Sequence, residues 1–363
     1  MNHPPSRKTT GSGRWLFLPA GEQAAWVRDW DDLNRRSHRS PLLQTWFLLP
    51  ALRHFGTGNE TVAVRRDGDD QVCAMLLLSP PRGTRRRAFK PSQIPISPIL
   101  LAPGEDLVET IRSLLKVLPR SILGIHLMHC DERLIAMPEA ALDVEVTVHM
   151  ETGSTFIGQN FSDYHARIPV RARQNLERRI RKAEKEVGTV TLQVCGDAAR
   201  IDEFLELYSA TELKGWKGKA GTAIRPESSQ GHFYRDILTA AAGQGSLRTF
   251  VLMFGSTPVA QQIAIDFEGI TYFLKTTFDG DFRAYSPGSI QHHRILEWSH
   301  AQTPPTRDSE IYGEIKQSTA PFITSQRRVY HLTVFRYGVM RPALDLWRRM
   351  KKSATSDHRP SIS

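Results

Sequence analysis

Apolar residues recur at helical spacing in several segments of the chain. Residues 21–36 place Trp26, Trp30 and Leu33 on one side, which predicts an amphipathic helix because residues three or four apart share one face. The same spacing predicts helices over residues 45–54, 106–118, 170–187, 198–212, 227–242 and 287–300.

Short apolar runs between turn residues indicate strands. The turn Asp67-Gly68-Asp69-Asp70 lies between residues 61–66 and 71–78, a pattern typical of a hairpin. Residues 247–254, 258–267 and 270–277 follow one another across short turns and predict a three-stranded meander. We expect further extended segments over residues 94–99, 122–128, 189–194, 310–312 and 328–335.

The order of these elements repeats along the chain, which has 363 residues, a length that favours two domains. We therefore predict an α/β fold class, with a mixed α+β sheet, present in two tandem copies. The first copy spans residues 14–151 and the second spans residues 160–338, with a junction at residues 152–163. The polar ends, residues 1–13 and 351–363, are expected to be disordered.

The amino-acid composition indicates which kinds of molecule the protein binds and where it is located. Lys and Arg number 48 against 38 Asp and Glu, giving a net charge of +10, which favours an anionic partner: a nucleotide cofactor, a nucleic acid or an acidic membrane face. Three widely spaced cysteines and no CxxC pair argue against a disulfide framework. We expect a cytoplasmic protein, because the apolar runs are too short to span a bilayer and no signal peptide is apparent.

The segment of residues 272–297 carries candidate chemistry, because a strand there runs through a polar loop into a helix. A helix start leaves backbone N–H groups without intrahelical partners, and these bind anions. Ser286 is expected to cap the helix, Pro287 suits its first turn, and Gly288 lets a ligand approach the backbone. With Arg283 beside it, the loop predicts a pyrophosphate site. The alternative is simply a capped helix start.

This segment also carries a family resemblance. The string LKTTFDGDFRAYSPGSIQHHRILEWSHAQ, preceded by LRTFVLMFGSTPVAQQIAI, resembles the BioF2-like or CelD-like branch of the GNAT acetyltransferases, in which a meander strand ends in a similar K-T-x-x-D-x-x-F-x-x-Y-S-P-G run. The string PVRARQNLERRIRKAEKEVGTVTLQV resembles the first helix and strand of that branch. The tandem arrangement is similar to that of FemABX-type peptidyltransferases.

The resemblance implies a sheet that splays between its fourth and fifth strands, with acetyl-CoA or another acyl-CoA in the split. The pantetheine is expected beside Thr276 and Thr277, and the pyrophosphate on the loop of residues 282–289. The cofactor-binding residues it implies are Lys275, Thr276, Thr277, Phe282, Arg283, Tyr285, Ser286, Pro287, Gly288 and Ser289.

Direct acyl transfer from a thioester needs a base for the acceptor and a proton for the departing thiolate. We take Glu314 and Asp266 as the candidate bases and Tyr312 as the proton donor. The alternatives are solvated element ends for the carboxylates and core packing for the tyrosine. The run IYGEIKQSTAPFITSQ departs from the family pattern, since Lys316 matches a lysine but the flanking tyrosine and tryptophan are missing.

Other charged segments of the sequence are compatible either with binding a ligand or with a solvated surface. Glu212, Lys214 and Trp216 are expected to bind the acceptor, with a solvated loop as the alternative. The basic residues between Arg171 and Lys185 are compatible with nucleic acid, but interleaved glutamates favour a solvated helix face. Residues 82–87 form a second basic segment, with peripheral membrane contact as an option.

Histidines are not expected to form a functional site. The run HLMHC at residues 126–130 has no second ligand pair nearby in the sequence, so no metal is predicted. For His292 and His293 we expect a surface position.

These observations predict an acyltransferase that moves an acetyl or other acyl group from acyl-CoA to an amine or hydroxyl. The family resemblance implies a small-molecule acceptor, such as an amino sugar or a cell-envelope precursor. Two alternatives remain: a Fem-like transferase that uses aminoacyl-tRNA, and a non-catalytic scaffold with the GNAT fold.

Overall fold

A computed structural model describes residues 13–21, 25–156, 158, 160–214, 223–302, 308–317, 319–339 and 341. The chain divides into two compact units. Unit 1 holds the described residues up to Leu52, then Gly56–His149 and those from Arg328 on, and unit 2 holds Arg53–Phe55 and Met150–Arg327. The predicted disordered ends, apart from Gly13, and the candidate residue Trp216 lie outside the described residues.

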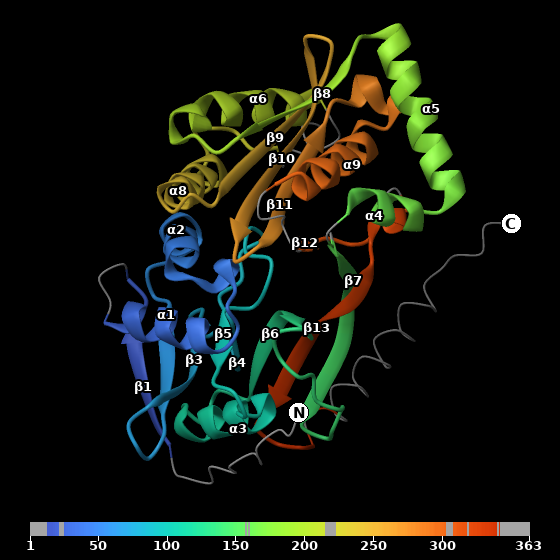
Figure 1. Cartoon of the computed structure of the whole chain (residues 1–363). Coiled ribbons are helices and arrows are strands. Elements are labelled where there is room, and N and C mark those ends of the chain that lie inside the picture. Colours follow the sequence, from blue (N-terminus) through green and yellow to red (C-terminus); the bar gives the residue numbers. More distant parts are fainter. Residues whose placement is uncertain are drawn as a thin grey trace, which may run out of the picture. The chain divides into compact units, whose positions relative to one another are not determined.

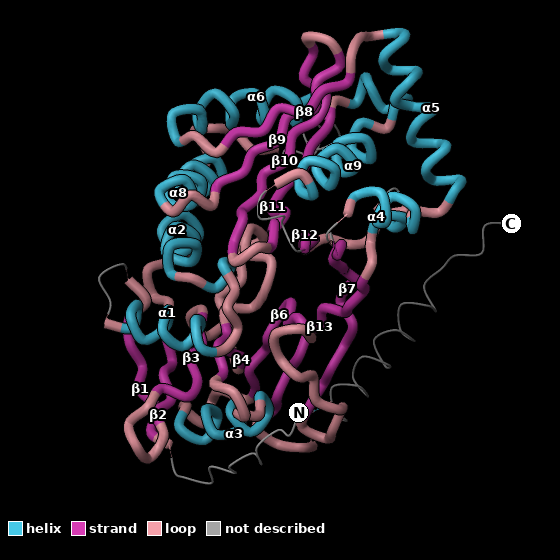
Figure 2. Tube along the Cα trace, in the orientation of Figure 1, coloured by secondary structure: helices cyan, strands magenta, loops and turns pink. Residues whose placement is uncertain are grey.

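Unit 1 contains a four-stranded antiparallel sheet in the order β1-β2-β3-β5, and a second group of strands in the order β4-β6-β13-β7. The strands are β1 (Arg14–Pro19), β2 (Thr61–Arg66), β3 (Val72–Leu78), β4 (Arg85–Arg87), β5 (Ile99–Leu101), β6 (Gly124–Asp131), β7 (Val144–Phe156) and β13 (Ser325–Phe335). The helices are α1 (Trp26–Arg36), α2 (Thr45–Phe55) and α3 (Leu107–Val117). Strands β7 and β13 each pass from one unit into the other (Figures 1 and 2).

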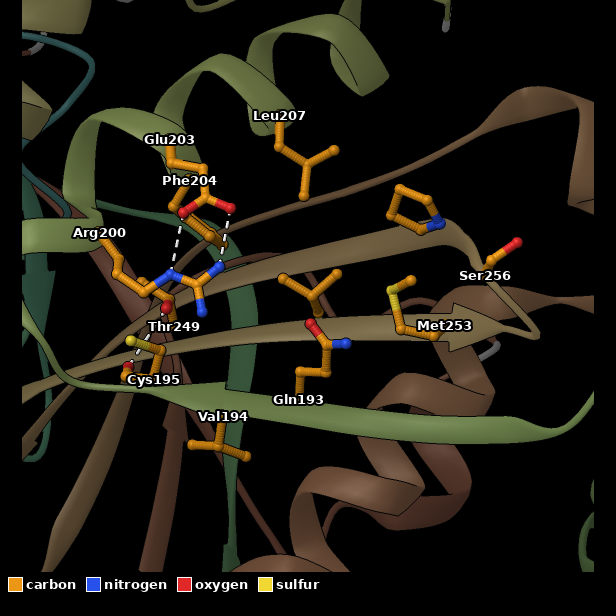
Figure 3. A pocket seen from close by; sticks show the side chains of 12 residues that line it. Gln193, Val194, Cys195, Arg200, Glu203, Phe204, Leu207, Thr249, Met253 and Ser256 are labelled. Carbon is orange, nitrogen blue, oxygen red and sulfur yellow. Dashed lines mark hydrogen bonds and ion pairs between the residues drawn. The ribbon is translucent and has the colours of Figure 1, made fainter.

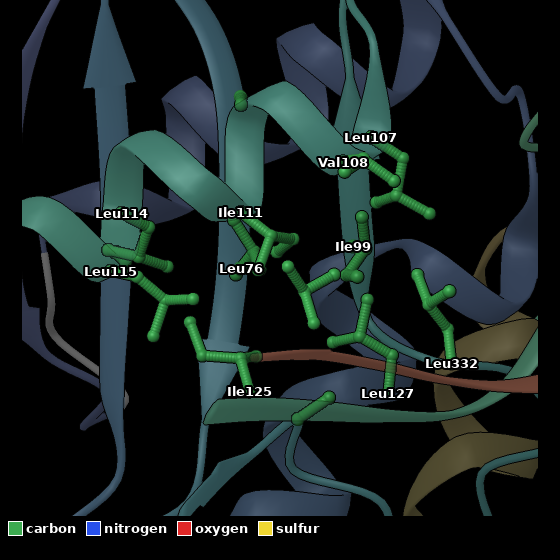
Figure 4. Close-up of a cluster of buried hydrophobic side chains, with 14 of the residues drawn as sticks. Leu76, Ile99, Leu107, Val108, Ile111, Leu114, Leu115, Ile125, Leu127 and Leu332 are labelled. Carbon is green, nitrogen blue, oxygen red and sulfur yellow. The ribbon is translucent and has the colours of Figure 1, made fainter. Parts of the chain in front are cut away.

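The core of unit 1 forms beneath α3, whose apolar side chains lie three or four residues apart and therefore share one face. Figure 4 shows this face packed on side chains from β3, β5, β6 and β13. The members labelled there are Leu76, Ile99, Leu107, Val108, Ile111, Leu114, Leu115, Ile125, Leu127 and Leu332. Truncating one such buried Leu or Ile to Ala typically costs about 2–5 kcal/mol, so this face fixes the position of α3.

Unit 2 contains strands in the order β7-β12-β11-β10-β9-β8, in which only β11 and β12 pair in parallel. Its strands are β8 (Val190–Cys195), β9 (Leu247–Phe254), β10 (Thr257–Phe267), β11 (Ile270–Phe278) and β12 (Asp308–Ile311), besides the end of β7. Its helices are α4 (Phe161–Arg167), α5 (Val170–Glu186), α6 (Ile201–Lys214), α8 (Ser229–Gly243) and α9 (Pro287–His300).

Side chains along each strand of unit 2 point alternately to the two faces of the sheet, and helices cover both faces. Phe250, Leu252 and Phe254 of β9 join clusters with residues of α9, whereas Val251 and Met253 face a cavity that α6 also lines. Helix α9 therefore covers one side of the meander, and α6 and α8 cover the other (Figure 1). This is the arrangement that the period-two alternation of a strand produces when both faces are buried.

The predicted tandem repeat is confirmed. Unit 1 runs β1, α1, α2, β2, β3, β5, α3, β6, and unit 2 runs β8, α6, α8, β9, β10, β11, α9, β12. Strand β7 was not predicted, although apolar and polar residues alternate over residues 144–151, which is the pattern of a strand. Its last residues occupy the start of the predicted junction at residues 152–163. Among the described residues, no helix is both long and apolar enough to cross a membrane.

Candidate functional site

Among the described residues, no strand pairs with the second half of β11 on its β12 side. Residues Ile270–Phe273 pair with Asp308–Ile311 of β12, and that ladder ends there. On the other side, the ladder with β10 continues to Phe278. Counting from β8, the sheet therefore opens between its fourth and fifth strands, as expected. Thr276 is exposed beside this opening and Thr277 is buried. A strand edge of this kind can pair with amide groups of an extended ligand.

The strand leads through a turn of 3-10 helix, Gly280–Tyr285, into the start of α9. Ser286 precedes the helix with a left-handed backbone (φ 54°, ψ 58°), and its side chain makes no capping hydrogen bond. The predicted cap is therefore wrong, because a capping side chain needs the extended backbone that Ser286 does not adopt. No acidic residue lies in the first turn of α9. The Ser289 and Ile290 N–H groups donate to the Ser286 carbonyl oxygen at 3.0 and 3.3 Å. The first turn therefore offers an external anion the Gly288 N–H and the helix dipole.

A cavity of about 420 Å³ lies against this helix start. Helix α9 contributes Ser286 and Ser289, and α5 contributes Arg179 across from them. The remaining lining residues are Ala172, Asn175, Leu176, Gln317, Pro321 and Phe322. Arg179 is half-buried, and no carboxylate of the described residues forms an ion pair with it. The cavity therefore combines a helix N-terminus with a guanidinium group, which together suit a phosphate.

The cations of helix α5 lie in different surroundings, since most are exposed to solvent whereas Arg179 lines the cavity. Most of its charges are exposed, as a solvated face requires: Arg178 donates a hydrogen bond to Asn175 at 3.1 Å, and Lys182 lies 3.9 Å from Glu186. Arg179 differs, since it lines the cavity. The sequence did not single out Arg179, because Ser286 lies far from it along the chain and only folding brings them together.

The aromatic residues of the loop hold it in place. Phe282 and Tyr285 pack against the apolar cluster beneath α9. The Tyr285 hydroxyl donates a hydrogen bond to Glu186 of α5 at 2.8 Å, and the Lys182 ammonium lies 5.2 Å from the Tyr285 ring centre. Arg283 is exposed. Gly288 has open space, since an added Cβ would meet nothing closer than Phe278 at 4.0 Å.

Lys275 does not approach the helix start and does not pair with Asp279. Its ammonium lies 3.6 Å from Glu212, which is buried and also accepts a hydrogen bond from the Ile224 N–H at 2.7 Å. Asp279 pairs instead with Lys214 at 2.9 Å. These two ion pairs tie α6 to β11 and to the residue that follows it. The geometry thus places Glu212 and Lys214 as supports of the loop beside the opening.

The candidate catalytic residues occupy three different places. Asp266 lies at the far end of β10, opposite Thr271, which donates a hydrogen bond to it at 2.6 Å. Burial raises the Asp266 pKa, while Thr271 and Arg248 lower it. Seven residues at about 3.3 Å each separate Thr271 from Phe278, so Asp266 lies roughly 20 Å along the sheet from the loop. Glu314 is exposed beyond β12.

Tyr312 lies closer to the opening, because it follows Ile311, the last residue of β12 that pairs with β11. Its ring is nearly parallel to that of Tyr272, with centres 6.4 Å apart. The Arg327 guanidinium lies 5.1 Å from the Tyr312 ring centre and 2.7 Å from Glu310. The sequence analysis did not identify this pair of buried charges, since Glu310 and Arg327 meet only through the return of β13.

A larger cavity, of about 750 Å³, lies between α6, β8 and β9 (Figure 3). Arg200 and Glu203 form a two-bond ion pair in it, at 2.7 and 2.9 Å. Strand β10 separates β9 from β11, so this cavity is about 10 Å or more from the open edge. The first turn of α6 lines this cavity, but it contains Asp202 and Glu203, which disfavour an anion there. We therefore take the smaller cavity at α9 as the candidate site.

His292 and His293 of α9 are buried, so the predicted surface position is wrong. The His293 ring lies 5.5 Å from that of Phe161 in α4, and the His292 ring lies 5.3 Å from that of Phe322. The helix is covered on both sides, by the sheet and by these aromatic residues. Burial lowers the pKa of both histidines to about 4.

Comparison with known proteins identifies the fold. Three solved structures extend over most of both chains. FemX is 9% identical, with 88% of this chain and 98% of that chain covered and a TM-score of 0.53. A conserved protein of unknown function from Bacteroides thetaiotaomicron VPI-5482 is 12% identical, with 85% and 97% covered and a TM-score of 0.52. A tandem GNAT protein from the clavulanic acid biosynthesis pathway is 14% identical, with 89% and 99% covered and a TM-score of 0.50.

At such identities the likeness shows the fold alone, and that fold is the tandem GNAT arrangement. Residues 170–308 match the family model described as the acetyltransferase (GNAT) domain. The matched segment lies in unit 2, and the fold of the chain is the tandem GNAT fold. No curated protein matches the sequence.

Proposed function

We propose that unit 2 transfers an acyl group from an acyl-CoA, such as acetyl-CoA, to an amine or hydroxyl acceptor. The observation that carries this proposal is the cavity at the start of α9, where Ser286, Ser289 and Arg179 converge. A second feature is the end of the β11–β12 ladder at Phe273. An extended ligand with a pyrophosphate at one end and amides along its arm fits both features.

The pyrophosphate is assigned to the helix start and Arg179. A charge-assisted hydrogen bond contributes about 1.5–3 kcal/mol, and a helix N-terminus adds roughly 0.3–2 kcal/mol for an anion. The pantetheine amides are assigned to β11 beyond Phe273, where the ladder with β12 has ended. This arrangement brings the thioester toward the point where β11 and β12 part.

The chemistry at that point is direct attack of the acceptor on the thioester carbonyl. The acceptor loses a proton to a base, for which Glu314 is the proposed group. The departing thiolate takes a proton from Tyr312, which stands at the parting of the strands with Arg327 over its ring. A nearby guanidinium favours the phenolate that forms, since opposite charges stabilise each other.

For the acceptor we propose a small amine, such as an amino sugar or a cell-envelope precursor, in the cytoplasm. The three cysteines are free thiols, as a reducing compartment favours. The exposed basic face of α5 is close to the cofactor cavity, so it is the surface on which an acidic acceptor would first bind.

Calorimetry with acetyl-CoA tests the proposal, using wild type, Gly288→Ala and Gly288→Trp. The alanine has room beside Phe278, so it is the matched control and is expected to bind like wild type. The indole of Gly288→Trp is expected to fill the cavity and abolish binding. Equal binding by Gly288→Trp, or no binding by wild type with any acyl-CoA, would refute the cofactor assignment.

A Fem-like reaction with aminoacyl-tRNA is the second candidate, and the exposed cations of α5 favour it. These are Arg171, Arg178, Arg181, Lys182 and Lys185. Binding of charged tRNA that weakens steeply with salt, together with no acyl-CoA binding, would establish this alternative. Acyl-CoA binding without turnover across a panel of amines and alcohols would instead favour a non-catalytic scaffold.

A further inference from the structure

Three histidines of unit 1 converge on one side of its strands. They are His129 of β6, His149 of β7 and His331 of β13. Nitrogen atoms of the three rings all lie within 4.8 Å of one another. The His149 ring centre is 4.2 Å from that of His129 and 4.3 Å from that of His331. The sequence run at residues 126–130 predicts no metal because no further ligand lies nearby, but folding supplies two from distant segments.

The convergence follows from strand order and from a β-bulge. Strand β13 lies between β6 and β7, so side chains on one face of the three strands are neighbours. Tyr330 pairs with Cys130 and Leu332 pairs with Leu127, which leaves two residues, Met128 and His129, opposite the single residue His331. Bulges of this kind redirect a side chain and are frequent beside functional sites.

His129 is the residue that the bulge redirects. Its backbone is left-handed, with φ of 58°, a conformation that few residues other than glycine adopt. Regular alternation would place His129 on the same side as Leu127, which is in the apolar core. The bulge instead leaves Leu127 and Cys130 in that core and turns His129 toward His149 and His331. Strain retained at one residue in this way is a feature of functional sites.

The hydrogen bonds of the cluster leave lone pairs for a ligand. The Nδ1 atom of His129 lies 3.1 Å from the Pro95 carbonyl oxygen, which can only accept, so Nδ1 carries the proton and Nε2 is the free base. A ring N–H held by a carbonyl is the usual support of a metal-binding histidine. His331 Nδ1 accepts a long hydrogen bond, 3.3 Å, from the His129 N–H, which a metal would displace at little cost.

We propose that His129, His149 and His331 bind a divalent transition-metal ion of the Zn²⁺ type. Three imidazoles with a water as the fourth ligand form an established zinc geometry, and imidazole suits Zn²⁺, Ni²⁺ and Cu²⁺ in general. A tetrahedral ion with bonds of about 2.0–2.1 Å needs nitrogen atoms about 3.3 Å apart. The cluster must therefore contract, and the exposed side chain of His149 is the one that can move.

The positive charge of Lys90 lies near the cluster and would repel a bound metal cation, which offers a further test of the proposal. Its ammonium interacts electrostatically with both His129 and His331. Replacing it by the neutral Lys90→Gln removes a repulsion with the cation and is expected to tighten metal binding several-fold. A cluster of histidines that serves only to pack would show no such effect.

The experiment is a titration of the untagged full-length chain with Zn²⁺ and with Co²⁺, followed by calorimetry and visible absorption. We expect one ion per chain, Co²⁺ bands typical of four-coordination, and a rise in Tm on adding Zn²⁺. His149→Gln and His331→Gln are expected to weaken binding at least about 100-fold, more than the loss of a supporting group does. The matched control is His126→Gln, since His126 lies on the same strand but bonds to Thr333.

Unchanged affinity in His149→Gln and His331→Gln, or equal loss in His126→Gln, would overturn the proposal. So would the absence of a one-to-one complex in wild type at micromolar Zn²⁺. Circular dichroism of each variant reports whether it folds. If His331→Gln does not fold, His149→Gln decides the question, because its side chain is exposed and its loss leaves the core intact. Acetyl-CoA binding is expected to be the same in all of these variants.

Discussion

Helices α3 and α9 occupy equivalent positions in the two copies of the fold, since α3 follows β5 and α9 follows β11. Their first turns are opposite in character. Asp106 caps α3, accepting a hydrogen bond from the Glu109 N–H at 2.8 Å, and Glu105 and Asp106 line a cavity of about 270 Å³ there. The start of α9 has no side-chain cap, no acidic residue and Arg179 across its cavity.

This difference predicts that an anion binds at the helix start of unit 2 and not at that of unit 1. In unit 1 the helix dipole is already satisfied by a carboxylate of the chain itself, and a phosphate would meet two like charges. In unit 2 the same dipole remains for a ligand. The fold is therefore repeated in the two units, whereas the residues at the two helix starts differ, and we propose that this difference determines which unit binds a cofactor.

Ser286→Asp would place a carboxylate before α9, where Asp106 stands before α3, and has the largest expected effect. Aspartate tolerates the left-handed backbone at this position. Because like charges placed together in a binding site cost several kcal/mol, we expect acetyl-CoA to bind at least about 100-fold more weakly. Calorimetry measures this, with the uncharged Ser286→Asn as the control. If the aspartate variant bound acetyl-CoA as tightly as wild type, the proposed difference between the starts of α3 and α9 would be contradicted.

Acid should act on α9 through His292, whereas α3 contains no histidine. Burial lowers the His292 pKa to about 4, so between this value and about 6.5 the unfolded chain binds the proton more strongly. Stability is therefore complete above about pH 6.5 and is lost as the pH falls. From pH 7 to pH 5 we expect wild type to lose roughly 2 kcal/mol more than His292→Phe. Urea unfolding at the two pH values measures this, and parallel losses would contradict it.

Arg179→Ala should weaken acetyl-CoA binding about tenfold, the lower range for a hydrogen bond to a charged group. The neighbouring Arg178→Ala is the matched control, since Arg178 is exposed and donates its hydrogen bond to Asn175 of the same helix. Calorimetry of the two variants side by side separates a specific contact from the general charge of α5. Equal losses would assign the effect to that general charge.

Asp106→Ala has the smallest expected effect. Loss of a helix cap costs about 1 kcal/mol, so the free energy of unfolding should fall by about that amount, as measured by urea unfolding. Acetyl-CoA affinity should not change, because this cap belongs to the copy that is not assigned a cofactor. A change in affinity would show that the two helix starts are not independent.

The elements with a regular apolar period could be predicted from the sequence. The meander β9 to β11 and the bounds of α9 follow from alternation and from Pro287 in the first helical turn. Strand β7 was missed although apolar and polar residues alternate over residues 144–151, so the sequence itself did not hide it. The left-handed backbone at Ser286 was also missed, since a Ser-Pro-Gly run is equally compatible with a capping serine.

The loop of the candidate site was found from local residues, but its partners were not. Arg179 shares the cavity with Ser286 only because α5 packs beside α9. Glu212 and Lys275 carry charges that look solvated in the sequence, and only the packing of α6 on β11 shows that they are paired in the interior. Contacts between distant segments have no periodic signature, so a single sequence does not reveal them.

A crystal structure of the full chain with acetyl-CoA tests most directly whether the start of α9 is the cofactor site. We predict the pyrophosphate within hydrogen-bond distance of the Gly288 N–H and the Arg179 guanidinium, with the pantetheine arm along residues 274–278. A cofactor bound instead between α6, β8 and β9, or at the start of α3, would contradict the assignment.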